Sequence, residues 1–95
     1  MRISLLQPEI TRGNIARNVE AVQRLVEMAQ GDLLVLPEYA LTGSLVLDPS
    51  ADVREWVRMS AQAEARLAIP EGRYLMTNTL IDADGKLYNL SLIHI

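Results

Sequence analysis

The sequence predicts an α/β fold built around a parallel pair of strands. Three observations predict it: a short β-type run at the start, a helical stripe of apolar residues in 14–29, and a continuous apolar run in 33–36. A strand, a helix and a buried strand in this order form a βαβ unit, and we expect its crossover to be right-handed. This order therefore favours a parallel sheet with helices packed on it.

Local residue patterns predict the first strand and the first helix. Arg2–Gln7 (RISLLQ) is a β-type run that ends at Pro8, because proline cannot extend a ladder of backbone hydrogen bonds. After a loop, Asn14 is a residue type that caps helices. Gly31 is expected to end the helix in a left-handed conformation. Apolar residues recur between them in steps of four and three, which predicts a core-facing stripe: Ile15, Val19, Val22, Val26 and Ala29, widened by Ala16, Leu25 and Met28.

A buried strand follows the first helix. Leu33–Leu36 (LLVL) is a continuous apolar run between Asp32 and Pro37. A short run without alternation predicts a strand that is covered on both of its faces. Glu38–Pro49 is rich in turn-forming residues and is predicted to be a loop.

The second half predicts another helix and a hairpin. A helix is expected over Ala51–Leu67, and Leu67–Ile69 is expected to form a brief strand before Pro70. The inner face of the helix is predicted from residues at helical spacing: Val53, Trp56, Val57, Ser60, Ala61, Glu64 and Leu67. The hairpin consists of a strand, a turn and a returning strand: Tyr74–Ile81, Asp82–Gly85 (DADG) and Lys86–Leu90.

Composition excludes several classes of site and partner. The chain has 95 residues, 12 acidic and nine basic, and a formal net charge of −3. A net-negative chain without a basic cluster is a poor binder of nucleic acid. It has no Cys and one His, so a disulfide framework and a Cys-based or two-His zinc site are excluded. No apolar run is long enough to cross a membrane, and we expect a cytoplasmic protein.

Glu38 is the first candidate for a functional residue. It directly follows the predicted buried strand, and ligands of open α/β sheets bind beyond the carboxyl ends of such strands. Low dielectric and neighbouring groups at such a place turn a carboxylate into a useful base. The alternative is an ordinary loop carboxylate or a helix cap. Tyr39 and Thr42 are candidates to line a substrate pocket beside Glu38, although packing and loop hydrogen bonds explain them equally well.

Several motifs, in order, resemble the carbon–nitrogen hydrolase family, also called the nitrilase superfamily. The first is the apolar run that ends in Pro37-Glu38, followed by Leu41-Thr42-Gly43. The second is Tyr74–Asn89 (YLMTNTLIDADGKLYN), in which an Asn-Thr pair precedes an apolar strand and an Asp-Gly turn. The opening run and the first helix are similar to the family as well. The resemblance extends from Met1 to about Asn89.

The resemblance implies a fold and a mechanism. The family folds as a four-layer α-β-β-α sandwich, so residues 1–95 are expected to be its N-terminal part, about a third of the domain. Its enzymes use a Glu base, a Lys that stabilises the tetrahedral intermediate and a Cys nucleophile, and they hydrolyse small amides or nitriles. The resemblance assigns the base to Glu38. Lys86 lies at the Asp-Gly turn and is expected to be a solvated residue. No metal or organic cofactor is implied, and the family commonly forms homo-oligomers.

Three readings of the function remain open at this point. The first is an amidase or nitrilase whose Lys and Cys lie outside these residues, so that this chain alone is inactive. The second is a glutaminase or acyltransferase domain of the same superfamily. The third is a non-catalytic α/β binding module that keeps Pro-Glu only for packing.

The end of the chain departs from the family pattern. Leu90–Ile95 (LSLIHI) stands where the family has a basic strand, and it resembles one reading frame of a transposon-end adapter used in sequencing libraries. We therefore expect these six residues to be foreign to the gene. The alternative is a native apolar strand.

Overall fold

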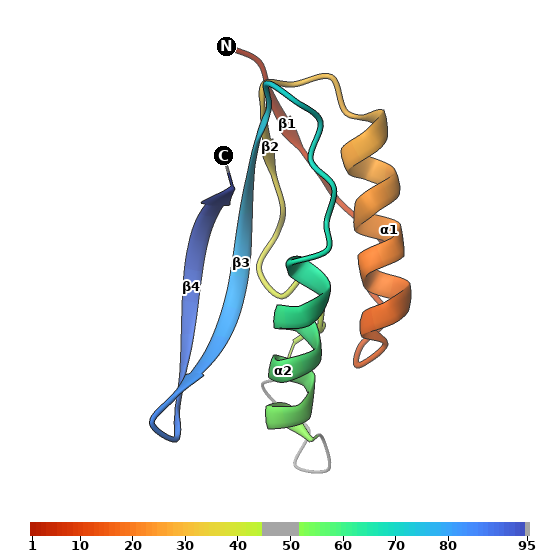
Figure 1. The fold of residues 1–95 in the computed structure, drawn as a ribbon. Coiled ribbons are helices and arrows are strands. Elements are labelled where there is room, and N and C mark those ends of the chain that lie inside the picture. Colours follow the sequence, from red (N-terminus) through yellow and green to blue (C-terminus); the bar gives the residue numbers. More distant parts are fainter. Residues whose placement is uncertain (45–51, 95) are drawn as a thin grey trace.

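A computed structural model describes residues 1–44 and 52–94, which form one four-stranded sheet and two helices (Figure 1). This arrangement confirms the predicted α/β class. The elements follow one another as β1 (Ile3–Leu5), α1 (Ile15–Met28), β2 (Leu33–Val35), α2 (Val53–Glu64), β3 (Tyr74–Ala83) and β4 (Lys86–His94). Neither of the two described helices is long and apolar enough to cross a membrane.

The sheet is mixed and its strands lie in chain order. β1 pairs with β2 and β2 pairs with β3, both in parallel, so the predicted parallel pair is confirmed. β3 and β4 are antiparallel and form the predicted hairpin. In the register of the sheet, Ile3, Leu33 and Tyr74 lie side by side across the three parallel strands.

The first helix begins where the sequence predicts. The Asn14 side chain accepts a hydrogen bond from the backbone N–H of Arg17 (3.1 Å) and so caps α1. Two predicted stripe residues are wrong, because Ala16 and Met28 are exposed. Asn18, which is not part of the apolar stripe, is fully buried. A polar residue thus lies on the inner face of α1, near the start of the helix.

Gly31 has a different role from the one predicted. Its φ is not positive. The helix ends at Ala29, and the backbone of Ala29 itself is already extended. A Cβ atom at Gly31 would instead lie 2.5 Å from the Ser4 Oγ and 2.7 Å from the Ser4 backbone nitrogen. Gly31 is therefore required for the close approach between the segment before β2 and strand β1.

The second helix is shorter than predicted, and the brief strand after it is absent from the described chain. Asp52 caps α2 by accepting a hydrogen bond from the Glu55 N–H, while Ala51 lies outside the described residues. Leu67–Ile69 forms no strand, because the backbone N–H and C=O of Ala68 both bond the side-chain amide of Gln23 at 2.9 Å. Strand pairing there is replaced by a contact with α1.

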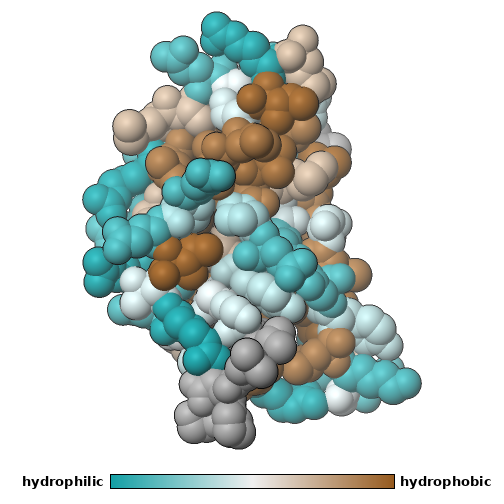
Figure 2. Space-filling model, turned by 180° about the vertical axis from the view of Figure 1, so that it is seen from behind, coloured by the Kyte–Doolittle hydropathy of each residue, from teal (hydrophilic) through white to brown (hydrophobic). Residues whose placement is uncertain are grey.

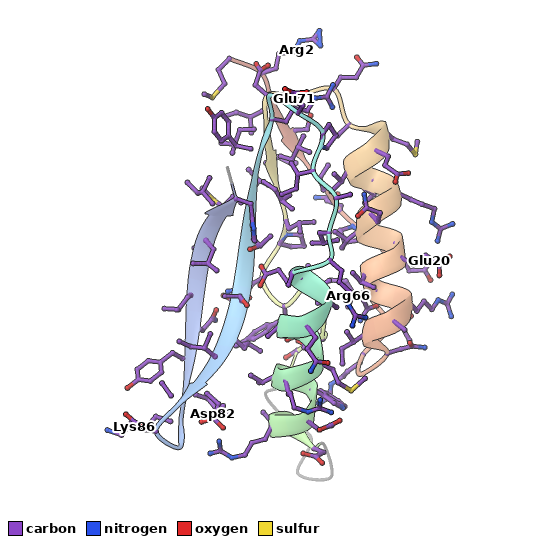
Figure 3. All side chains as sticks on the ribbon, viewed as in Figure 1. Arg2, Glu20, Arg66, Glu71, Asp82 and Lys86 are labelled. Atoms are coloured by element: carbon purple, nitrogen blue, oxygen red, sulfur yellow. The ribbon has the colours of Figure 1, made fainter. Side chains whose placement is uncertain are left out.

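The hairpin turns at Asp84 and Gly85. Both residues have positive φ, 52° and 80°, as a type I′ turn requires, and they join the paired residues Ala83 and Lys86. Figure 3 shows Lys86 and Asp82 near the hairpin tip, and Lys86 is exposed there as expected. β4 continues beyond the predicted end at Leu90 as far as His94.

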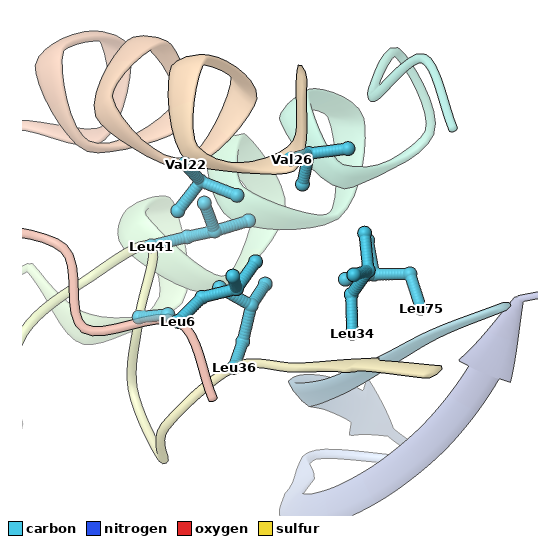
Figure 4. Packing of buried hydrophobic residues seen from close by; sticks show 8 residues of the cluster. Leu6, Val22, Val26, Leu34, Leu36, Leu41 and Leu75 are labelled. Atoms are coloured by element: carbon cyan, nitrogen blue, oxygen red, sulfur yellow. The ribbon is translucent and has the colours of Figure 1, made fainter. Parts of the chain in front are cut away.

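The core lies between the helices and one face of the sheet (Figure 4). Val22 and Val26 of α1 are completely buried, as are Leu34 of β2 and Leu75 of β3. These residues pack with Leu6, Leu36, Ala40 and Leu41 in one cluster. The loop after β2 therefore contributes directly to the core through Ala40 and Leu41.

The described residues leave the other face of the sheet open, although the apolar run of β2 predicts a strand covered on both faces. Leu34 is buried, whereas its neighbours Leu33 and Val35 are only half-buried. Figure 2 shows hydrophobic side chains gathered in the upper half of the surface seen from behind. We call this the open sheet face, and its apolar residues by register are Ile3, Leu5, Leu33, Val35, Tyr74, Met76 and Ile93. The described residues thus form one helix layer and one sheet layer.

Candidate functional site

Glu38 lies on the loop that leaves the carboxyl end of β2. The Leu36 N–H still bonds the Met76 carbonyl at 3.0 Å, so pairing with β3 continues almost to Pro37. The chain then leaves the sheet, and the Glu38 side chain is exposed. Within residues 1–44 and 52–94, its carboxylate accepts no hydrogen bond and forms no ion pair. This carboxylate is available to a ligand or to another part of the protein.

The backbone turns sharply directly after Glu38. Tyr39 has φ +58°, which is a genuine outlier for a bulky residue, because the left-handed region crowds its Cβ. Two hydrogen bonds hold this conformation. The Tyr39 N–H donates to the Asn78 Oδ1 (2.8 Å), and the Tyr39 carbonyl accepts from the Gly43 N–H (2.8 Å). Strained residues of this kind cluster at functional sites.

A second amide side chain holds the far end of the same loop. Asn18 of α1 is fully buried, and its Nδ2 donates to the carbonyls of Leu41 (2.9 Å) and Thr11 (2.8 Å). Its Oδ1 accepts the Thr11 N–H (2.7 Å). The segment that follows Glu38 is therefore fixed from β3 at one end and from α1 at the other.

Thr42 is buried within this loop. Its Oγ1 donates to the Gly43 carbonyl (2.8 Å), and its own carbonyl accepts the Gly13 N–H (2.8 Å). Thr42 and Tyr39 line a common cavity whose volume is only about 10 Å³. That is barely room for one water molecule. The contacts of Thr42 in the described chain are thus those of a loop-bracing residue.

A larger space lies between α2 and the hairpin. Tyr39 borders it together with Val57 of α2 and Leu80, Leu87 and Tyr88 of the hairpin. Its volume is about 290 Å³, close to the lower limit for small-molecule sites, and most of its wall is apolar. The Glu38 loop reaches this space through Tyr39, and Glu38 itself is not one of its lining residues.

Three polar residues that contact the Glu38 loop or strand β3 were not among the predicted site residues. Asn18 and Asn78 bond the loop, and Glu64 of α2 is buried next to β3. Glu64 accepts a hydrogen bond from the Thr77 hydroxyl, and the His94 Nε2 lies 3.3 Å from its Oε1. The signal for Asn18 and Glu64 is in the sequence, because each is a polar residue at a core position of a helical stripe.

Neither metal chemistry nor a shifted pKa marks a second site in the described residues. No group of three or more His, Cys, Asp or Glu side chains is arranged to hold a metal ion there. A hydrogen bond between Arg58 and Glu55 on the surface of α2 lowers the pKa of Glu55 and raises the pKa of Arg58. Both groups are exposed and satisfy each other, which is the behaviour of a surface ion pair.

No protein-family model matches the chain, and no curated protein matches it significantly. The resemblance to carbon–nitrogen hydrolases therefore depends on the motif residues themselves.

Proposed function

We propose that this chain is the N-terminal part of a carbon–nitrogen hydrolase of the amidase or nitrilase type, with Glu38 as its general base. The observation that carries the proposal is an exposed carboxylate on a firmly held loop at the carboxyl end of β2, which has parallel neighbours on both sides. The Pro37-Glu38 and Leu41-Thr42-Gly43 motifs supply the family resemblance for the same loop.

The contacts of Glu38 favour this role over packing or capping. The described helices are capped by Asn14 and Asp52, not by Glu38. A packing residue would be buried, whereas the Glu38 side chain is exposed and bonds no described residue. The loop that presents it is nevertheless braced by Asn78 and Asn18. Rigid support of a free carboxylate is what a catalytic base needs.

The open sheet face supports the four-layer sandwich implied by the resemblance. Its residues Ile3, Leu5 and Tyr74 are 41–72% exposed although they are large and apolar. In an α-β-β-α sandwich, a second sheet covers this face. We call the protein with that further sheet and with the Lys and Cys signatures the full-length protein.

The proposed mechanism is the acyl transfer that the family resemblance implies. Glu38 takes the proton of a Cys thiol, and the thiolate attacks the amide or nitrile carbon. A Lys and backbone N–H donors stabilise the developing charge. With an amide, Glu38 returns the thiol proton to the nitrogen, which leaves as ammonia; a nitrile first gives a thioimidate, which adds water and then loses ammonia. The regenerated Glu38 carboxylate then activates the water that hydrolyses the acyl-enzyme. A glutaminase or acyltransferase would use the same residues with another substrate or acceptor.

Sequencing and an activity assay test the proposal together. The locus is amplified from source DNA across codon 89, and we expect a reading frame that continues into a basic strand with a Lys and later a Cys. The encoded protein should release ammonia from small amides or nitriles, and Glu38→Ala should abolish that release. A genomic LSLIHI followed by a stop codon would contradict the proposal. So would a folded full-length protein without a Cys, which would indicate a binding module.

A further inference from the structure

We infer that Asn78 is a positioning residue for the proposed base, because its side-chain amide holds the backbone directly after Glu38. This inference depends on the proposed function of Glu38. It concerns a contact between residues 39 positions apart, which local sequence patterns do not reveal.

The hydrogen bonds of Asn78 define the orientation of its amide. Its Oδ1 accepts the Tyr39 N–H (2.8 Å), and its Nδ2 donates to the Asn89 Oδ1 and to the Leu90 carbonyl (3.4 Å). The flipped amide would place its NH₂ against the Tyr39 N–H and its oxygen against two acceptors. Both ends of the amide are thus matched, and the contact joins the loop to β3 and β4.

The hydrogen bond from the Tyr39 N–H to Asn78 stabilises a residue with an unfavourable backbone conformation. Tyr39 has a left-handed conformation that costs about 1–2 kcal/mol for a residue with a Cβ. Without an acceptor for its N–H, the loop gains by relaxing toward ordinary backbone angles. Relaxation at Tyr39 rotates the preceding peptide and therefore displaces Glu38.

The side chain of Asn78 is not itself a reacting group. Its amide neither gains nor loses a proton as an acid or base at neutral pH, and both of its ends are occupied by protein partners. Its influence on the reaction is the placement of the Glu38 carboxylate relative to the proton that it removes. A misplacement of about 1 Å is enough to slow a reaction about a hundredfold.

The test compares four variants of the full-length protein. Asn78→Leu removes the acceptor for the Tyr39 N–H, whereas Asn78→Asp keeps a carboxylate oxygen there. Gln23→Leu is the matched control, because Gln23 also uses both ends of its amide on a backbone segment, at Ala68. Glu38→Gln reports on the base itself. For each variant kcat, KM and the melting temperature are measured, together with the exchange rate of the Tyr39 amide proton.

We expect Asn78→Leu to lower kcat about 10- to 100-fold and to change KM less than about threefold. Asn78→Asp should recover part of that kcat and slow the exchange of the Tyr39 amide again, because it keeps the acceptor for the Tyr39 N–H but loses the donor to Asn89 and Leu90. Gln23→Leu should lower the melting temperature comparably with no such loss of kcat. If Asn78→Leu does not fold, Asn78→Ser takes its place, because its hydroxyl does not reach the Tyr39 N–H.

Two results would overturn the inference. One is a folded Asn78→Leu protein with wild-type kcat, and the other is an equal loss of kcat in Asn78→Leu and Gln23→Leu. The two proposals fail in distinguishable ways. If Glu38→Gln retains wild-type kcat, the proposed function fails whatever the Asn78 variants do. If Glu38→Gln is inactive and the Asn78 variants are fully active, only the role of Asn78 fails.

Discussion

Two asparagine side chains brace the loop that carries Glu38, and they differ in burial. Asn78 is half-buried at the sheet, whereas Asn18 is completely buried in the inner face of α1. A buried amide is tolerated only when its donors and acceptor are paired, and all three hydrogen bonds of Asn18 go to backbone groups. At the scale of single residues, one buried and one half-buried amide side chain therefore determine the shape of this loop.

Replacement of Asn18 should destabilise the protein strongly. Asn18→Ala leaves the buried Leu41 carbonyl and the part-buried Thr11 N–H without their partner, whereas the Thr11 carbonyl keeps its bond from the Asn14 N–H (3.1 Å). Each unpaired group costs about 1–3 kcal/mol, so we expect a loss of at least about 2 kcal/mol in the free energy of unfolding. Urea unfolding of the full-length protein measures it.

A nearby asparagine provides the control for that measurement. Asn14 is exposed and makes one capping bond, so Asn14→Ala should cost only about 1 kcal/mol. Equal losses in the Asn18→Ala and Asn14→Ala variants would contradict the assigned role of Asn18.

At the scale of elements, Gly31 determines how closely the segment before β2 approaches strand β1. A side chain there would collide with the backbone of Ser4, and backbone cannot move aside as a flexible side chain can. We expect Gly31→Ala to cost about 1–3 kcal/mol of stability through overpacking. Gly31→Asn separates this explanation from a left-handed helix end, because Asn tolerates positive φ but is larger than Ala. Its melting temperature should fall at least as far as that of Gly31→Ala, and a milder effect of Asn would contradict the steric role.

The elements differ in how well the sequence predicts them, for physical reasons. α1 and the hairpin follow from local signals, namely the Asn14 cap, the helical stripe and the Asp84-Gly85 turn. Leu67–Ile69 has the residues of a strand, but Gln23 of α1 takes the backbone groups of its central residue. That contact spans 45 positions, and no local pattern indicates it.

The signals that single out Glu38 as a candidate are local in sequence. They are the end of β2 and the motif that resembles carbon–nitrogen hydrolases. The bonds from Asn78 and Asn18 to the Glu38 loop join residues 39 and 23 positions apart, so only the fold reveals them. The polar stripe position of Asn18 is a signal that a count of apolar residues leaves out.

At the scale of the whole molecule, the open sheet face determines the stability of the isolated chain. A chain of 95 residues buries only about 60–65% of its unfolded surface even when its fold is complete. Here one face of the sheet also leaves large apolar residues exposed, Leu5 at 72% among them. β4 adds an unpaired edge. The single helix layer must therefore stabilise the fold alone.

We expect the isolated 95-residue chain to be poorly folded and inactive. Calorimetry should show no sharp cooperative transition of a monomer, because the open sheet face favours loose or associated states. Ammonia release from amides and nitriles should equal that of a Glu38→Ala control, since the chain has no thiol nucleophile. A sharp monomeric transition would contradict the folding prediction, and release above the control would contradict the prediction of inactivity.

The rate of the Glu38→Gln variant in the full-length protein tests the central claim most directly. Gln has almost the same size as Glu and still accepts hydrogen bonds, but it cannot take up a proton at neutral pH. We predict that kcat and kcat/KM fall at least 10²–10⁴-fold, about 3–5 kcal/mol of barrier, while the melting temperature stays close to that of the wild type. A well-folded Glu38→Gln enzyme that keeps more than about a tenth of the wild-type kcat would contradict the assignment of Glu38 as the base.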